Sequence, residues 1–466
     1  MAKKQSILVA GGARAQGGTV QELEELFAPW LELPEDFGGG GAYDSLYAPP
    51  RTFWLFLSQV LAQDGACREV LRSFLAWLAR ARNKSASPST SAYCQARKRL
   101  REEDLAGAHR QVAGKIEAQA RPQDFWRGRR VKVVDGSSVS MPDTPQNQAR
   151  YPQPKGQKEG CGFPVMRIVA IFSLATGALL EIARDSLDVH ERTLFRHRWD
   201  SFAPGDVSLN DRGFAGYADF HCLKEQGVDS VSRNHQRRKN VELLKRLGKD
   251  DRLVLWRKTA VHLRPKWMSK EEWEAMPETL TVRQITVTVD IPGFRSETLE
   301  IVTTLLDPKA YPADAAAELY RRRWAIELHL RQIKITMNMD ILRCKTPDMV
   351  DKELWMHVIA YNLVRAIMLG AATAHAACLE RISFKGTLAT TRQWAPELAR
   401  AEDTEEHASL YTQMLYYIAA DLVPNRPGRA EPRARKRRPK NYPLLNKPRR
   451  QYVEIPHRNK HRKAKN

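Results

Sequence analysis

The chain has 466 residues, which at about 150 residues per domain suggests roughly three domains. Hydrophobic residues make up 42% and charged residues 28%, a balance that excludes wholesale disorder. The formal net charge of +21 favours a polyanionic partner, most simply nucleic acid and only second an anionic membrane.

The first 50 residues are rich in glycine at both ends and include a short acidic segment, residues 19–33, that predicts a helix. No Gly-Lys-Ser/Thr follows the glycines, which argues against a phosphate-binding P-loop. We expect residues 1–50 to be a mobile leader.

Apolar residues then recur at helical spacing over residues 51–120. The segment 92–103 within this region carries four basic residues, Arg97, Lys98, Arg99 and Arg101. A helical module with a basic face is typical of DNA contact, and an ordinary solvated helix face is the alternative.

From residue 126 onward, strands and helices alternate, which predicts an α/β layer. One short apolar strand ends at Asp135, and another leads into Asp211. The remaining elements expected here are strands at 164–173, 178–183 and 228–232 and helices at 189–199 and 217–225.

Residues 233–310 break this alternation with β-branched, period-2 segments, and we read them as a β-rich insertion. A single long helix is expected over 312–339, followed by helices within 349–380 and 408–422. The end of the chain, residues 425–466, holds 16 basic and 2 acidic residues, which predicts a basic tail without its own core.

Six cysteines are scattered singly, without the short spacing of a zinc or redox motif, so reduced thiols in a cytosolic protein are expected. The apolar stretch 358–379 is long enough to span a membrane, but Arg365 interrupts it. A buried core helix is the better interpretation of this stretch, and no membrane association is expected.

One stripe of the helix predicted over 312–339 carries a distinctive set of side chains. Tyr320, Arg323, Glu327 and Lys334 lie at offsets of 3, 7 and 14, which places them within about 60° of one helix face. Tyr and Arg can hold a phosphate, and a carboxylate can bind a hard cation. On spacing alone, a salt-bridged helix surface is the favoured explanation of the stripe.

Two further carboxylates, Asp135 and Asp211, follow strands, where sites form in open α/β sheets. With Glu327 they can hold two divalent metals, and oxygen ligands favour Mg²⁺ or Mn²⁺. Four other aspartates compete for these roles by composition, namely Asp143, Asp185, Asp188 and Asp206.

The stripe resembles the insertion-sequence transposases of the IS-four group, which carry a DDE triad and a YREK signature. That signature is Tyr, two residues, Arg, three residues, Glu, six residues and Lys, and Tyr320, Arg323, Glu327 and Lys334 satisfy every spacing.

The two aspartate segments are also similar to the blocks of this family. Residues 133–139 resemble the first-aspartate block, with Ser137 in place of the commoner Thr, and residues 211–214 resemble the second. The resemblance covers roughly residues 50–450.

This resemblance implies a fold and a division of the chain. The expected fold class is α/β, a ribonuclease-H-like catalytic core with a β-rich insertion, a helical N-terminal domain and a basic C-terminal tail. The expected divisions are a mobile leader at 1–50, a helical N-terminal DNA-binding domain at 51–125, the catalytic core at 126–232 and 311–380, the β-strand insertion at 233–310, a C-terminal helical region at 381–424 and the basic tail at 425–466.

The resemblance also implies roles. Asp135, Asp211 and Glu327 would bind two Mg²⁺ ions, for which Mn²⁺ could substitute, and catalyse cleavage and strand transfer of double-stranded DNA. Tyr320, Arg323, Lys334 and Arg212 would contact the DNA. Trp256, Trp267 and Trp273 are equal candidates for stacking on a base or for packing in the insertion's core.

The expected partners are the terminal inverted repeats of a mobile element and target DNA, with a homodimer in the DNA complex. The expected location is the bacterial cytoplasm, at the nucleoid when the protein is bound to DNA. The alternatives left open are a domesticated or inactive transposase-derived nuclease and a DNA-binding protein with a decayed metal site.

Overall fold

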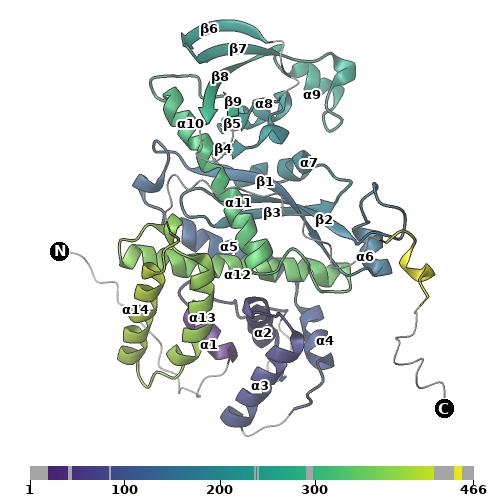
Figure 1. The fold of residues 1–466 in the computed structure, drawn as a ribbon, viewed down its shortest axis with the longest axis vertical. Helices are drawn as coiled ribbons and strands as arrows, with labels where there is room; N and C mark the ends of the chain where they lie inside the picture. The colour runs from purple at the N-terminus through teal and green to yellow at the C-terminus, as the bar shows by residue number, and fades with distance from the viewer. Residues whose placement is uncertain are drawn as a thin grey trace, which may run out of the picture. The chain divides into compact units, whose positions relative to one another are not determined.

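The computed structural model describes residues 19–39, 45–82, 86–235, 238, 241–289, 297–424 and 445–453. The chain divides into a helical unit, Met1–Ile116 with Trp355–Val423, and a sheet unit, Glu117–Leu354 with Pro424–Asn466 (Figure 1). Most of the expected basic tail and parts of the expected leader lie outside the described residues.

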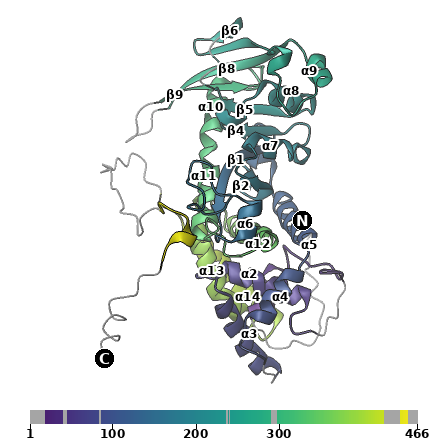
Figure 2. The same ribbon diagram turned by 90° about the vertical axis from the view of Figure 1, so that its right-hand side faces the viewer.

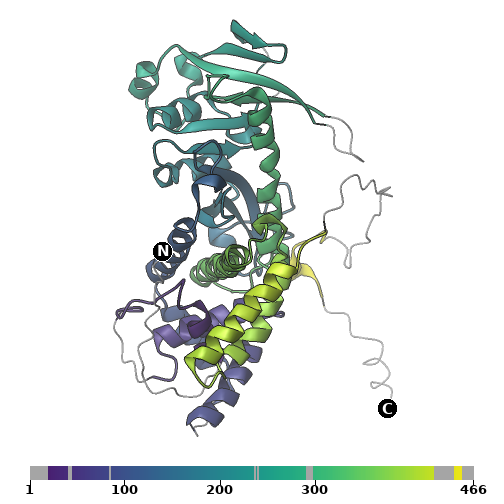
Figure 3. The same ribbon diagram turned by 90° about the vertical axis from the view of Figure 1, so that its left-hand side faces the viewer.

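The helical unit is built from amphipathic helices whose apolar faces pack together. Their bounds are α1 (Thr19–Phe27), α2 (Pro49–Leu61), α3 (Cys67–Arg82), α4 (Ser91–Arg99), α5 (Glu102–Glu117), α13 (Phe384–Leu398) and α14 (Thr404–Ala420), together with the part of α12 (Pro347–Ala374) from Trp355 onward. Figure 3 shows α13 and α14 side by side as an antiparallel pair.

Helix α12 is the one helix of the described chain that is long and apolar enough to cross a membrane. Within the protein, 89% of its apolar window is buried, which confirms the expectation of a core helix in this stretch.

The basic face expected on the segment 92–103 is only partly present. Arg97 of α4 is buried, where its Nη1 donates a hydrogen bond to Gln59 Oε1 at 3.2 Å. Lys98 and Arg99 are exposed. Arg97 therefore stabilises the packing of α4 on α2, and the prediction that it faces DNA is wrong.

The sheet unit contains a nine-stranded sheet in the order β3-β2-β1-β4-β5-β9-β8-β7-β6, among the residues described. Strands β1, β4 and β5 are parallel, and all other neighbours are antiparallel. The strands are β1 (Val131–Ser140), β2 (Val165–Ser173), β3 (Leu179–Ser186), β4 (Val207–Asn210), β5 (Asp229–Arg233), β6 (Glu242–Gly248), β7 (Asp251–Arg257), β8 (Thr279–Val289) and β9 (Glu297–Thr303).

Helices cover both faces of the β1–β5 part of the sheet, as Figure 2 shows. On one face α7 (Glu191–Arg196) and α8 (Tyr217–Glu225) bury a cluster that includes Val134, Phe195 and Phe214. On the other face lie α10 (Ala313–Arg322) and α11 (Trp324–Arg331). The remaining helices of the unit are α6 (Pro145–Arg150) and α9 (Lys270–Ala275).

The strands β6 to β9 extend this sheet, because β9 pairs with β5 at one side and with β8 at the other. Trp256 of β7 and Trp273 of α9 are buried in the core of this extension, whereas Trp267 is 39% exposed. Burial therefore makes Trp256 and Trp273 packing residues and leaves Trp267 accessible.

The helix expected over 312–339 is divided in the structure. α10 ends at Arg322, α11 begins at Trp324, and a π-helical turn follows at Gln332–Thr336. The periodicity of the sequence predicted the helical conformation correctly but did not reveal the break at Arg323.

Candidate active site

Two aspartates lie side by side where the parallel strands β1 and β4 part. The last parallel pair is Val134 with Asn210, so Asp135 and Asp211 are the next residue on each strand. The parallel register therefore places the two carboxyl-bearing residues at equivalent positions of neighbouring strands.

Asp135 was expected at the end of a strand, and this expectation is wrong. β1 continues to Ser140, because β2 pairs with it in antiparallel register from Lys132 to Ser140. Only the parallel partner β4 ends beside Asp135. At Asp135, the backbone of β1 is therefore paired with one neighbouring strand, β2.

Gly136 follows Asp135 and faces the opposite side of the sheet. A Cβ atom added at this glycine would lie 2.4 Å from Cδ of Glu191 in α7. A side chain at this position would thus push against α7, and the glycine allows the helix to pack closely beneath the aspartate.

Arg323, which stands between α10 and α11, lies among the carboxylates. Its Nη2 lies 3.2 Å from Glu327 Oε1, and its Nη1 lies 3.8 Å from Asp135 Oδ2. Although burial alone would lower it, the surrounding phenol and carboxylates raise the pKa of the Arg323 guanidinium. The guanidinium carries a fixed positive charge within the site.

The carboxylate of Asp135 is held in an environment that disfavours its charge. Burial raises its pKa to about 6, and the nearby charges of Asp211 and Glu327 add to this effect. The Gly136 N–H, which donates to Oδ1 at 2.8 Å, and Arg323 act in the opposite direction. The three carboxylates thus share one electrostatic environment, as residues with perturbed pKa values at functional sites commonly do.

Tyr320 approaches the second aspartate from α10. Its hydroxyl lies 3.5 Å from Asp211 Oδ1, and its side chain is buried. Burial raises the pKa of Tyr320 to about 12, so the phenol remains a hydrogen-bond donor at neutral pH.

Lys334 reaches the same region from the π-helical turn. Its Nζ donates a hydrogen bond to Ser137 Oγ on β1 at 2.8 Å. Burial lowers the pKa of the Lys334 ammonium. The sequence did not indicate Ser137 as a partner of Lys334, because the two residues are 197 positions apart and only the fold joins them.

The donor chemistry of Asp135, Asp211 and Glu327 suits a hard divalent cation, because all three offer carboxylate oxygens. Within the described residues, no three His, Cys, Asp or Glu side chains converge on one metal position. Arg323 lies between Asp135 and Glu327 instead. The three carboxylates are suitable ligands for a metal ion. In the structure, the Arg323 guanidinium instead balances the negative charges of Asp135 and Glu327.

The four competing aspartates are each engaged elsewhere with a neighbouring side chain. Asp185 pairs with Arg150, Asp188 with Lys155 and Asp206 with Lys132, while Asp143 accepts a hydrogen bond from Gln148. Each of these four carboxylates therefore has a local polar partner.

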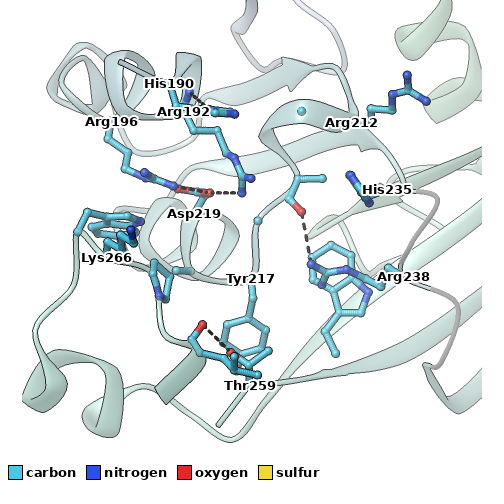
Figure 4. Close-up of a pocket in the computed structure, with 18 of the residues that line it drawn as sticks. His190, Arg192, Arg196, Arg212, Tyr217, Asp219, His235, Arg238, Thr259 and Lys266 are labelled. Carbon is cyan, nitrogen blue, oxygen red and sulfur yellow. Dashed lines mark hydrogen bonds and ion pairs between the residues drawn. The ribbon is translucent and has the colours of Figure 1, made fainter. Parts of the chain in front are cut away.

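A cavity of about 1180 Å³ opens beside the residues that follow Asp211 (Figure 4). Its basic lining residues are Arg192, Arg196, Arg212, Arg238, Arg257 and Lys266. Asp219 is the only carboxylate among the described lining residues, and it binds Arg196 at 2.6 Å. The cavity therefore has a strong positive charge.

Aromatic rings line the same cavity. The guanidinium of Arg196 lies 4.4 Å from the ring centroid of Trp267, and that of Arg238 lies 3.6 Å from the centroid of Trp256. Burial lowers the pKa of Arg238 to about 10. Except for Arg212, these basic residues could not be predicted from the sequence, because they come from separate elements without a common motif.

Comparisons with known proteins bear on this site. A family profile described as "Transposase DDE domain" matches residues 126–363. The transposase InsG for insertion sequence element IS4 of Escherichia coli (strain K12) is 28% identical over 291 residues, 60% of this chain and 62% of that relative. The putative transposase InsL for element IS186A of the same organism is 32% identical over 79 residues, 16% of this chain and 21% of that relative.

Among solved structures, the piggyBac transposase synaptic complex with hairpin DNA aligns with a TM-score of 0.39 and 10% sequence identity. The alignment covers 86% of this chain and 84% of that one. The chain therefore spans somewhat under two thirds of the length of its IS4 relative and most of the length of this structural neighbour.

Proposed function

This chain belongs to the family of DDE transposases, and on that premise we propose that it is an insertion-sequence transposase that cleaves DNA at element ends and joins them to target DNA. The observations that carry the proposal are that Asp135 and Asp211 follow the last parallel pair of β1 and β4 and that Arg323 pairs with both Asp135 and Glu327. We propose a ribonuclease-H-like core for the residues around this sheet, with 233–310 as its insertion.

Asp135, Asp211 and Glu327 would hold two Mg²⁺ ions, for which Mn²⁺ could substitute. When bound, such ions activate an attacking water or hydroxyl and stabilise the leaving oxygen in phosphodiester cleavage. Binding requires Arg323 to leave its position between Asp135 and Glu327, which frees its guanidinium to hold a phosphate in bidentate fashion.

The neighbouring side chains position the DNA. Tyr320, a protonated phenol at neutral pH, donates a hydrogen bond to a phosphate oxygen once it turns from Asp211. Lys334, held by Ser137, contacts the DNA backbone near the cleavage site. Arg212, the residue after Asp211, is one of the basic residues that line the cavity, and further phosphates bind there.

The substrate is double-stranded DNA, namely the terminal inverted repeats of the element and the target. Bringing two ends together requires two active sites, so the DNA complex is a homodimer. The protein acts in the bacterial cytoplasm, at the nucleoid when bound to DNA. Because lysines and arginines contact phosphates, binding weakens steeply as the salt concentration rises.

A cleavage assay tests the proposal. The purified chain is incubated with Mg²⁺ and a labelled duplex that contains the native element end, beside the variants Glu327→Gln and Glu318→Gln. Glu318 is an exposed residue on α10 that pairs with Arg321, so it serves as the matched control. We expect cleavage by the wild type and Glu318→Gln, and end binding without cleavage by Glu327→Gln. Cleavage by Glu327→Gln at the wild-type rate would overturn the assignment.

A further inference from the structure

Arg323 contacts two of the three carboxylates that we propose as metal ligands. Its Nη2 donates a hydrogen bond to Glu327 Oε1 at 3.2 Å, and its Nη1 lies 3.8 Å from Asp135 Oδ2. A divalent cation bound by the same oxygens would meet the positive charge of the guanidinium at close range, where like charges repel strongly. The guanidinium and a metal ion therefore compete for Asp135 and Glu327.

The contacts of Arg323 in this position leave hydrogen-bond donors unused. A guanidinium offers several N–H groups in a rigid fork. The Nε–H of Arg323 is buried and has no hydrogen-bond partner among the described residues, and the distance to Asp135 is too long for a hydrogen bond. The side chain is 11% exposed, so little solvent reaches it. A phosphate, whose oxygens match the fork, would satisfy these donors better than the two carboxylates do.

A phosphate bound at Tyr320 comes close to this arginine. Tyr320 is the residue that we assign to a phosphate oxygen, and the guanidinium carbon of Arg323 lies 5.8 Å from the centroid of its ring. Rotation about the side-chain bonds of Arg323 can therefore move the guanidinium from the carboxylates to such a phosphate while the backbone stays in place.

We propose that Arg323 couples the binding of DNA to the binding of metal ions. In the protein without DNA, Arg323 holds Asp135 and Glu327 and keeps their affinity for a divalent cation low. A phosphate of the DNA draws the guanidinium away, and the freed carboxylates then bind the cation more tightly. The inference rests on the proposed function, because it takes Asp135, Asp211 and Glu327 as the metal ligands.

The coupling acts in both directions. If DNA raises the affinity of the carboxylates for a metal ion, the metal ion raises the affinity for DNA by the same factor. A chain that is not bound to DNA then holds metal weakly, and the form that cleaves assembles on the DNA. A salt bridge that served only to stabilise the helix, as pairs one turn apart commonly do, would produce no such link.

Titration of Mn²⁺ against the full-length protein tests the coupling without relying on activity, because the electron paramagnetic resonance signal reports the free ion. The titration is run with and without a duplex that already ends at the native 3′ terminus of the element, so that no bond remains to be cut. The ions that the duplex binds by itself are measured separately and subtracted. For the wild type, we expect the duplex to lower the dissociation constant for Mn²⁺ by about 5–150-fold.

Variants of α10 and of the residue that follows it separate charge from packing. Without DNA, Arg323→Gln should bind Mn²⁺ about as tightly as the wild type does with DNA, because the competing charge is gone. Arg323→Lys keeps a positive charge and should stay closer to the free wild type. Arg321→Gln is the matched control, because Arg321 pairs with Glu318 at 2.6 Å and both side chains are exposed. It should bind Mn²⁺ like the wild type.

The outcomes distinguish the coupling from the metal site itself. Equal Mn²⁺ affinity of the wild type with and without the duplex would overturn the coupling, and so would equal affinity of free Arg323→Gln and the free wild type. The proposed function would survive either result if Glu327→Gln weakened Mn²⁺ binding. Binding of Mn²⁺ that did not respond to Glu327→Gln would overturn both the metal site and the coupling.

Discussion

Replacing the first aspartate of the triad should stabilise the protein when no metal is present. Burial, with added repulsion from Asp211 and Glu327, raises the pKa of Asp135 from its ordinary value of 3.8 to about 6. A folded-state pKa above the unfolded value contributes stability that is complete below pH 3.8 and is lost as the pH rises through about 6. A shift of about two units corresponds to about 3 kcal/mol.

Asp135→Asn resembles the protonated aspartate at every pH and keeps an oxygen to accept the Gly136 N–H. In urea unfolding with EDTA at pH 8, we expect Asp135→Asn to be more stable than the wild type by up to about 3 kcal/mol. The difference should shrink toward zero near pH 4. Saturating Mg²⁺ should stabilise the wild type and not the variant, because binding to the folded state alone raises its stability.

Asp185→Asn is the matched control with the opposite sign. Although burial would raise it, the hydrogen bond from Arg150 keeps the pKa of Asp185 below its usual value. This variant should therefore lose stability at pH 8 relative to the wild type. The reasoning is refuted if Asp135→Asn is equally or less stable than the wild type at pH 8 in EDTA.

Three further predictions concern the sheet unit. Arg283 is fully buried and holds Asp251 at 2.5 Å, so Arg283→Met should cost about 3–5 kcal/mol in urea unfolding. The double variant with Asp251→Leu should recover most of this loss, and failure to recover would argue against an unpaired buried charge. Ser137→Ala should slow DNA cleavage in single-turnover assays without changing end affinity, because Lys334 loses its anchor on β1. Trp267→Ala should weaken DNA binding by about 1–3 kcal/mol in fluorescence anisotropy if a base stacks on this exposed ring, and unchanged affinity would exclude that role.

The sequence predicted most of the elements that position the site. The apolar runs at 164–173 and 178–183 matched β2 and β3, and the helical spacing of Tyr320, Arg323 and Glu327 matched the face that meets the sheet. These features are local, since each depends on residues close together in the chain.

The features that the sequence missed depend on contacts between distant segments. The continuation of β1 past Asp135 comes from its pairing with β2, and the strand β6 carries mostly exposed residues without a buried face to mark it. The burial of Arg97 depends on Gln59 and Phe56 from α2. No pattern within a single segment could have revealed these partners.

The break at Arg323 has a similar origin. Residues 312–339 favour helix throughout by local spacing, and the contacts of Arg323 with carboxylates from β1 and α11 appear only in the folded structure. Asp135, Asp211 and Glu327 come from three separate segments of the chain, so the arrangement of the candidate site depends on the fold.

The most direct test of the central claim is an excision assay in cells. A donor plasmid carries the element's native flanking DNA around a marker, and the protein is supplied in trans as wild type, Glu327→Gln or Glu318→Gln. The account predicts excision with the wild type and Glu318→Gln and none with Glu327→Gln. Excision by Glu327→Gln at the wild-type frequency would contradict the assignment of this carboxylate, and with it the triad.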